Sequence, residues 1–263
     1  MAEASILFGA EKGVARITLN RPEVLNSFNG AMAQSLQQIL AEVSRDVSLR
    51  AVYLTGAGRA FCAGQDLAEA VGEKGAAIAD FGAQVRTMYN PLVLALRRMP
   101  KPVVCAVNGV AAGAGANLAL ACDIVVASDA ASFLQAFVKI GLVPDTGGTW
   151  VLPRLAGSAQ AAAMALLGEK ISAARAAELG MIYKVCPAAE LEATAFGLAL
   201  ELAAAPTYAL ALIKQLLAAS LDHSLEQQLE LEAESQGLAG RSADYREGVQ
   251  AFLEKRKPFF TGK

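Results

Sequence analysis

Histidine is almost absent from this sequence, and its scarcity excludes several kinds of active site. The 263 residues include a single histidine, His223, which lies in a polar helical stretch near the C-terminal end. A Ser-His-Asp triad uses histidine as its general base, and histidine-based metal centres need several such ligands. We therefore expect neither kind of site, predict no bound metal, and place His223 at the surface.

An excess of charge of one sign is also lacking. Lys and Arg number 23 and Asp and Glu number 25, for a formal net charge of −2, which offers no basic surface for nucleic acid. The N-terminus has no basic segment followed by a long apolar core, so we expect no secretory signal. The cysteines, Cys62, Cys105, Cys122 and Cys186, are widely spaced in apolar surroundings, which predicts buried free thiols and a cytoplasmic location.

Long hydrophobic runs are missing as well. The chain is 54% hydrophobic with a mean hydropathy of +0.38, yet no uncharged apolar run reaches the length of about 18 residues that a membrane span needs. We therefore expect no contact with a membrane and assign the surplus apolar surface to contacts between subunits. The sequence predicts a homo-oligomer, and a monomer in analytical ultracentrifugation would contradict this.

The order of the expected elements indicates an α/β protein. Strands alternate with helices in the first part, and helices dominate from about residue 158, which predicts a parallel-sheet core followed by a helical part. We place the core in residues 1–200 and a helical oligomerisation region in residues 201–263. Residues 69–82 lack periodicity and are expected to form a loop or irregular helix beside the site. The other elements expected include a hairpin at 5–8 and 14–19, helices at 30–45 and 83–98, and strands at 50–55, 103–107, 124–127 and 182–185.

A stretch of small residues, Cys105 to Asp123, is the most informative part of the chain. Six of the seven positions from Ala111 to Asn117 are Gly or Ala, so the backbone there can approach another group closely. A helix expected to begin near Gly113 would present N–H groups without internal partners, which can hold an anion or a developing oxyanion. Tight packing of a helix on a strand explains the same composition equally well.

A second stretch, Ala60 to Leu67, repeats the order of strand, small-residue turn and helix start. The backbone N–H of Gln65 and that of Ala114 could therefore converge on one oxygen. Two such donors would stabilise the oxyanion of a thioester enolate.

Few side chains could then move a proton. Asp145 lies in an uncharged loop before a glycine pair that opens a helix, so it either serves as an acid–base group or caps that helix. Asp66 and Asp123 are expected to be structural. Asn117, one turn beyond Ala114, can form hydrogen bonds but cannot move a proton at neutral pH.

Three ordered motifs resemble the signatures of the crotonase (enoyl-CoA hydratase/isomerase) family: AFCAGQDL, AVNGVAAGAGANLALACD and GLVPDTGGTWVLPRLAG. The resemblance extends over the full length, from RITLNRPEVLNSFN to YREGVQAFLEKRKPFFTGK. It implies a spiral of ββα units with a C-terminal helical trimerisation region, assembled as a trimer or a dimer of trimers. It also implies an acyl-CoA thioester substrate whose carbonyl lies between the backbone amides of Gln65 and Ala114.

Two pocket positions depart from the family pattern. Hydratases of the family carry two catalytic glutamates, which would fall at Asn117 and Phe137. Neither residue is acidic, so the addition of water lacks the groups that activate and orient it. Family isomerases often use an acid at the position of Asp145, and one carboxylate is enough to remove a proton from one carbon and return it to another. Phe137 is expected to keep the pocket dry.

Within the family, NRPEVLNSFN, YNPLV, VPDTGGTW and the C-terminal tail resemble the isomerases of phenylacetate degradation. That resemblance implies conversion of the ring 1,2-epoxide of phenylacetyl-CoA to oxepin-CoA, with Asp145 as the acid–base group. It also suggests shifts of double bonds in enoyl-CoA. No cofactor is implied, because coenzyme A enters as part of the substrate.

The resemblance further implies contacts with coenzyme A. Val24 and Leu25, together with Ala63, Asp66 and Leu67, would flank the adenine and pantetheine. The basic tail that begins at Lys255 could meet phosphates, including those bound to a neighbouring subunit. An ordinary solvated helix end explains this basic tail equally well.

Two other functions stay open. One is an enoyl-CoA hydratase of the fatty-acid β-oxidation type, which would hold its water with Asp145 and Asn117. The other is a non-catalytic member of the fold that binds RNA or a protein partner, although the acid is present and net positive charge is lacking. A dinucleotide site is not indicated, because GAGAN does not meet the GxGxxG spacing.

Overall fold

The computed structural model describes residues 4–67 and 80–263. Within these ranges the larger sheet has the strand order β1-β2-β3-β5-β7-β10. β1 pairs antiparallel with β2, which confirms the expected hairpin, and the other neighbours pair in parallel. The strands are β1 (Ile6–Glu11), β2 (Val14–Leu19), β3 (Ala51–Gly56), β5 (Val103–Val107), β7 (Ile124–Ser128) and β10 (Lys184–Cys186).

A smaller sheet of short strands has the order β4-β6-β8-β9. β3, β5 and β7 of the larger sheet are each followed along the chain by β4, β6 and β8 of the smaller one, so successive turns of the chain add one strand to each sheet. This is the expected spiral of ββα units. β6 and β9 were not predicted, because a three-residue strand is too short to show a period in the sequence. The strands are β4 (Ala60–Cys62), β6 (Val110–Ala112), β8 (Ser132–Leu134) and β9 (Lys170–Ser172).

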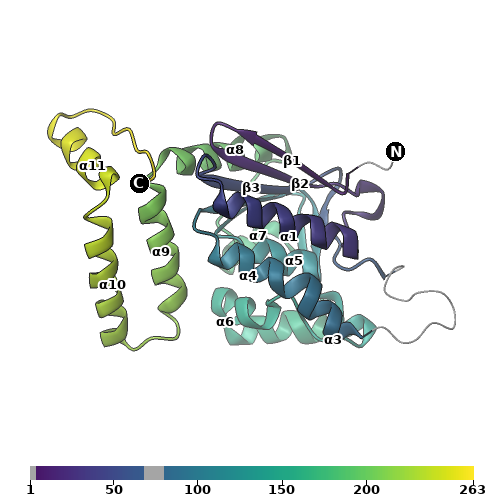
Figure 1. Ribbon diagram of the computed structural model, residues 1–263. Coiled ribbons are helices and arrows are strands. Elements are labelled where there is room, and N and C mark those ends of the chain that lie inside the picture. Colours follow the sequence, from purple (N-terminus) through teal and green to yellow (C-terminus); the bar gives the residue numbers. More distant parts are fainter. Residues whose placement is uncertain (1–3, 68–79) are drawn as a thin grey trace.

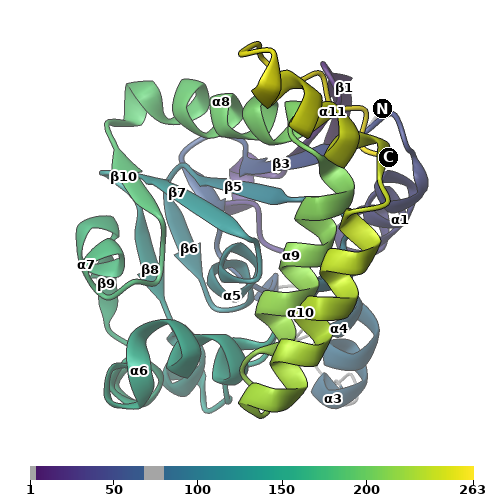
Figure 2. The same ribbon diagram turned by 90° about the vertical axis from the view of Figure 1, so that its left-hand side faces the viewer.

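Helices cover both faces of the larger sheet (Figures 1 and 2). α8 (Leu191–Ala204) packs on one face, while α1 (Gly30–Arg45), α4 (Asn90–Arg98) and α5 (Ala114–Leu120) belong to the core on the other. β3 serves both cores by alternation: Tyr53 contacts Phe196 of α8 with ring centroids 5.5 Å apart, whereas Leu54 points to the opposite side. A strand buried on both faces explains why β3 is apolar without a period of two.

The segment that leads into α4 differs from the single helix expected at 83–98. α3 (Phe81–Gln84) passes into a π-helical turn (Val85–Tyr89), and α4 follows. Gln37 of α1 donates to the carbonyls of Thr87 and Met88 at 2.8 and 3.0 Å, which supports the widened turn. π turns are rare and occur frequently at functional sites. Residues 69–79 of the expected loop lie outside the described ranges.

The C-terminal helices α9 (Thr207–Ala219), α10 (Leu225–Ala239) and α11 (Ala243–Leu253) stand to one side of the sheets in Figure 1. The expected boundary after residue 200 falls inside α8. Along the chain, α6 (Gly148–Leu167) and α7 (Ala173–Glu178) precede α8. In the described ranges no single helix is long and apolar enough to cross a membrane, although Ala188–Ala204 and Thr207–Ala219, bent by 109°, pass that test as a pair.

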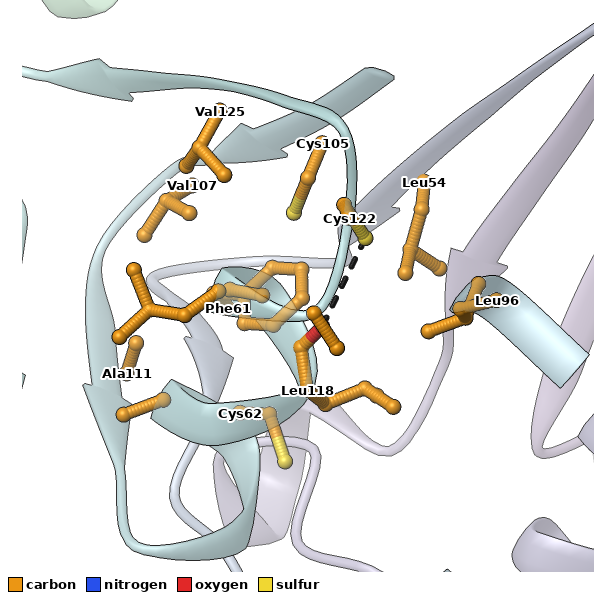
Figure 3. Close-up of a cluster of buried hydrophobic side chains, with 14 of the residues drawn as sticks. Leu54, Phe61, Cys62, Leu96, Cys105, Val107, Ala111, Leu118, Cys122 and Val125 are labelled. Carbon is orange, nitrogen blue, oxygen red and sulfur yellow. Dashed lines mark hydrogen bonds between the residues drawn. The ribbon is translucent and has the colours of Figure 1, made fainter. Parts of the chain in front are cut away.

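The four cysteines are buried free thiols, as the sequence predicted. Three of them, Cys62, Cys105 and Cys122, lie in one apolar cluster (Figure 3). Cys122 Sγ donates to the carbonyl of Leu118 at 3.5 Å. The cluster joins the end of β4 and the middle of β5 to the C-terminal end of α5, so the two small-residue stretches share one core.

Lys214 of α9 ties the C-terminal helices to the core. Its ammonium lies 2.7 Å from Oδ2 of Asp123, and the two side chains are only 12% and 17% exposed. The ammonium also donates to the carbonyl of Lys101 at 3.0 Å. Asp123 Oδ2 accepts from the N–H of Val103 at 2.8 Å, so Asp123 has the structural role expected of it.

Lys214→Met is expected to lower the free energy of unfolding by about 3 kcal/mol, because it leaves the Asp123 carboxylate buried without its cation. Urea unfolding followed by circular dichroism measures the change. Lys184→Met, at an exposed position of β10, is the control and should alter the same quantity by less than about 0.5 kcal/mol. Equal losses in the two variants would contradict the assigned role of Lys214.

Candidate active site

The first expected amide donor follows strand β4. Gly64 has a φ of +97°, a backbone conformation that suits glycine. The N–H of Phe28 donates to the carbonyl of Gly64 at 2.7 Å, and the N–H of Asp66 donates to the carbonyl of Phe28 at 2.8 Å. In such a parallel bridge the intervening residue, Gln65, directs its own N–H away from Phe28. That N–H can therefore face the cavity described below.

The second expected donor lies at the start of α5. Ala114 is the first helical residue, so its N–H has no acceptor within the helix. A Cβ built on Gly64 would lie 2.9 Å from the carbonyl oxygen of Ala112 and 3.5 Å from the nitrogen of Ala114, so the two turns meet backbone to backbone. Within residues 4–67 and 80–263, the N–H groups of Gln65 and Ala114 have no hydrogen-bond acceptor.

Cys62, the last residue of β4, lies beneath both turns. The N–H of Gly64 donates to Cys62 Sγ at 3.4 Å. A Cβ built on Gly115 would lie 2.3 Å from the carbonyl oxygen of Cys62 and 2.7 Å from its Sγ. Burial raises the pKa of the Cys62 thiol to about 12, so the sulfur stays neutral. The small residues thus let the two turns pack closely, which is the condition for their amides to converge.

A cavity of about 570 Å³ opens onto these two turns. That size is typical of a small-molecule site. Its remaining walls come from the segment that begins at α3 and from the chain between β8 and α6. The lining residues are Ala63, Gly64, Gln65, Leu67, Phe81, Gly82, Val85, Arg86, Asn90, Gly113, Ala114, Ala136, Phe137, Lys139, Ile140, Leu142, Val143, Pro144 and Asp145.

Asp145 is the one carboxylate that lines this cavity in the part of the chain that the structure describes. It does not cap α6, because Gly147 holds the N-cap position, so the helix-cap interpretation is wrong. Burial raises the pKa of Asp145, and a hydrogen bond from the Thr146 hydroxyl opposes that rise. A carboxylate with a raised pKa in the same cavity as two amide donors can take a proton from carbon and return it.

A family model described as enoyl-CoA hydratase/isomerase matches residues 9–263. The chain belongs to this family. It is 55% identical over 258 residues to the 1,2-epoxyphenylacetyl-CoA isomerase of Escherichia coli (strain K12), with 98% of each chain covered. It is 48% identical over 263 residues to a probable enoyl-CoA hydratase of Rhodobacter capsulatus, with all of both chains covered. A crystal structure of a putative enoyl-CoA hydratase/isomerase from Mycobacterium abscessus matches with a TM-score of 0.92 and 40% identity, covering 98% of this chain and 100% of that one.

Asn117 was expected to line the pocket, but its side chain lies inside the wall. The residue is fully buried. Its Nδ2 donates to the backbone carbonyl of Asp145, and its Oδ1 accepts from Nε2 of Gln135, both at 2.8 Å. Because both polar atoms are engaged inside the wall, Asn117 holds the Asp145 loop from behind and does not line the cavity. Phe137 does line it, with its ring 3.6 Å from where a Cβ on Gly113 would lie.

The residues expected to contact coenzyme A have four different placements in this family member. Ala63 and Leu67 line the cavity. Val24 and Leu25 lie beside it, since the N–H of Ala63 donates to the carbonyl of Leu25 at 2.9 Å. Asp66 forms an ion pair of 2.9 Å with Arg21, which fits its expected structural role. Lys255 follows α11, away from α3 (Figure 1), so its contact with coenzyme A stays a prediction for a neighbouring subunit.

The opposite wall of the cavity begins in the segment expected beside the site, but its lining residues were not singled out from the sequence. Phe81, Val85, Arg86 and Asn90 reach it from α3, the π turn and the start of α4. Only Asn90 belongs to a quoted motif, YNPLV. The π turn changes which side chains share a face, so helical periodicity misplaces Val85 and Arg86. Gln84 of α3 accepts a 2.8 Å hydrogen bond from the Gln65 side chain, which joins this wall to the first amide turn.

Proposed function

We propose that this family member is an acyl-CoA isomerase that converts the ring 1,2-epoxide of phenylacetyl-CoA to oxepin-CoA. The proposal rests mainly on one observation: Asp145 lines the same cavity as the amides of Gln65 and Ala114. Among the described residues, Asp145 is the one carboxylate that lines this cavity. The 55% identity to the Escherichia coli isomerase, whose name specifies that substrate, supports it.

Proton transfer through an enolate accounts for the reaction. The N–H groups of Gln65 and Ala114 bind the thioester carbonyl oxygen, and the ionised Asp145 removes a proton from the α-carbon. The electron pair of that C–H bond enters the enolate, whose oxygen the two amides stabilise. The proton returns to a ring carbon in conjugation with the enolate, while the ring expands as the carbon–carbon bond of the epoxide opens. No atom is gained or lost, so the proposed reaction needs no cofactor.

The cavity disfavours the competing addition of water. Phe81, Val85, Phe137 and Leu142 present apolar surface to the substrate, and an apolar wall limits the access of water to the enolate. Hydration also needs a second group that orients the water. Asn117 cannot serve that purpose, because its amide is bonded to Asp145 and Gln135 inside the wall.

Incubation with a 3-enoyl-CoA in water tests the reaction class. Mass spectrometry is expected to show a product of unchanged mass, and the absorbance of a conjugated 2-enoyl thioester should appear. The ring epoxide of phenylacetyl-CoA is then expected to turn over to a product of the same mass. A gain of one water in the first reaction would identify a hydratase, and a ring epoxide left unchanged would overturn the proposed substrate.

The assembly and its location are part of the same proposal. Large apolar side chains are exposed on and around α9, α10 and α11, and their burial would stabilise a trimer or a dimer of trimers. In such an assembly Lys255 would reach the phosphates of coenzyme A bound to a neighbouring subunit, and the enzyme would act in the cytoplasm. The exposed side chains are Ile213, Leu217, Leu221, Leu225, Leu229, Leu238, Tyr245, Val249, Phe252, Leu253 and Phe259.

A further inference from the structure

Thr146, the residue after Asp145, combines strain with a hydrogen bond. Its φ is +52°, its side chain is buried with 2% exposure, and its hydroxyl donates to Oδ1 of Asp145 at 2.8 Å. A β-branched residue with positive φ is an outlier, and such a conformation is strained. Glycine or asparagine would adopt it at lower cost, so the threonine side chain contributes something that offsets the strain.

The contacts of Thr146 place it behind the carboxylate. The backbone carbonyl of Asp145 is held by Nδ2 of Asn117 and by the N–H of Gly148, both at 2.8 Å. Thr146 does not line the substrate cavity; it lines a separate hollow together with Asn117 and Trp150. Thr146 therefore touches Asp145 without touching a bound substrate.

We propose that Thr146 is a positioning residue that selects the carboxylate oxygen through which Asp145 exchanges its proton. The Thr146 hydroxyl occupies Oδ1 and fixes the rotation of the carboxylate, so Oδ2 takes the proton. As the α C–H bond breaks, an O–H bond forms at Oδ2, the C–H electron pair becomes the C=C bond of the enolate and the carbonyl π pair moves to the thioester oxygen. In the return step the O–H bond at Oδ2 breaks, and the enolate electrons form a C–H bond at the conjugated ring carbon as the carbonyl is restored. The inference rests on the proposed function, since it concerns the proton transfer of that reaction.

The same hydrogen bond tunes the acidity of Asp145. Burial raises the pKa of Asp145, and the Thr146 hydroxyl lowers it by donating to the ionised form. Removal of the hydroxyl is therefore expected to raise that pKa further. Asp145 must be ionised to accept a proton, so the acidic limb of the pH–rate profile should move to higher pH.

Other charged groups near Asp145 are the same in every Thr146 variant. In the described ranges, Arg86 of the π turn and Lys139 of the 3-10 helix Ala136–Ile140 line the cavity. Arg97 of α4 and Arg154 of α6 lie over the ring of Trp150, with centroid distances of 5.4 and 4.2 Å. A shift of the profile in the variants would thus report the loss of the hydroxyl.

Washout of deuterium from phenylacetyl-CoA labelled at its α-carbon isolates the proposed proton transfer, because this thioester has no epoxide to open. The rate is followed in ordinary water by mass spectrometry across a range of pH. Thr146→Ser keeps the hydroxyl and is expected to stay within about twofold of the wild-type rate. Thr146→Val keeps the shape but loses the hydroxyl, so the carboxylate is free to rotate and the washout rate is expected to fall by about tenfold or more. Its acidic limb should also lie at higher pH.

Thr146→Gly separates positioning from a merely structural role. It removes the hydroxyl and also relieves the unfavourable φ, so the melting temperature is expected to hold or rise while the washout rate falls. Thr149→Val, at an exposed position in the first turn of α6, is the matched control and should leave rate and profile unchanged. A Val variant whose profile superimposes on that of the wild type would overturn the role of Thr146, as would equal losses in Ser and Val. Washout absent from the wild-type enzyme would instead overturn the proposed function itself.

Discussion

Asp145→Asn is expected to lower kcat by about 10³-fold or more, because an amide cannot accept the proton that the carboxylate removes. The substitution keeps the volume of the side chain, and its oxygen can still accept the hydrogen bond from Thr146. Binding of the thioester through the amides of Gln65 and Ala114 should therefore persist. Steady-state rates with a 3-enoyl-CoA and a binding titration with a non-reacting acyl-CoA measure the two quantities separately.

Asp222→Asn is the matched control for this variant. The Asp222 side chain is 67% exposed, and its ion pair with Arg154 is long at 3.4 Å, so the substitution should leave turnover unchanged. A circular dichroism spectrum equal to that of the wild type would show that the Asp145→Asn variant is folded. Turnover retained within tenfold in that variant would remove Asp145 from the mechanism.

Gly115→Ala is expected to lower kcat by about 10²-fold or more, which is the cost of losing one oxyanion donor. A Cβ at this position would lie 2.3 Å from the carbonyl oxygen of Cys62, so backbone must move. The residue that moves with it is Ala114, whose N–H is the second donor. The thioester should still bind through the rest of the cavity, so kcat is expected to fall more than KM rises.

Gly197→Ala serves as its control, since Gly197 also lies within a helix and a Cβ there meets nothing within 4 Å. That substitution should keep kcat and slightly stabilise the protein, because alanine favours the helix over glycine. Steady-state kinetics and thermal unfolding are compared for the two variants. An unchanged kcat in Gly115→Ala would mean that the two turns do not form the oxyanion site.

The sequence predicted the parts of the site that depend on backbone. The small residues around Gly64 and Gly113 indicated close turns, and the structure brings those turns into contact. Asp145 was singled out because few other carboxylates lie in uncharged surroundings, and it does line the cavity. The helix that regular apolar spacing predicted from about Gly30 to about Arg45 is observed at Gly30–Arg45, where the Asn29 side chain caps its start.

Other parts of the site depend on contacts between residues far apart in the chain, which no local sequence pattern predicts. Asn117 lies on the expected helix, but its side chain is directed by Gln135 and by the carbonyl of Asp145, 18 and 28 residues away in the chain. The strain at Thr146 follows from the loop geometry and leaves no trace in composition. Val85 and Arg86 reach the cavity from a π turn, and a rule based on 3.6 residues per turn misplaces such positions.

The placement of Gln65 and Ala114 after neighbouring strands has a consequence for how such a site can change. β4 and β6 pair side by side, and paired strands lie about 4.8 Å apart. Two N–H donors that each approach one oxygen to about 2.9 Å are separated by a similar distance. The spacing between paired strands of the sheet thus sets the distance between the two N–H donors. The wall that would contact the acyl group comes instead from helical segments. Insertions and substitutions in that wall can exchange one acyl group for another while enolate chemistry is left intact.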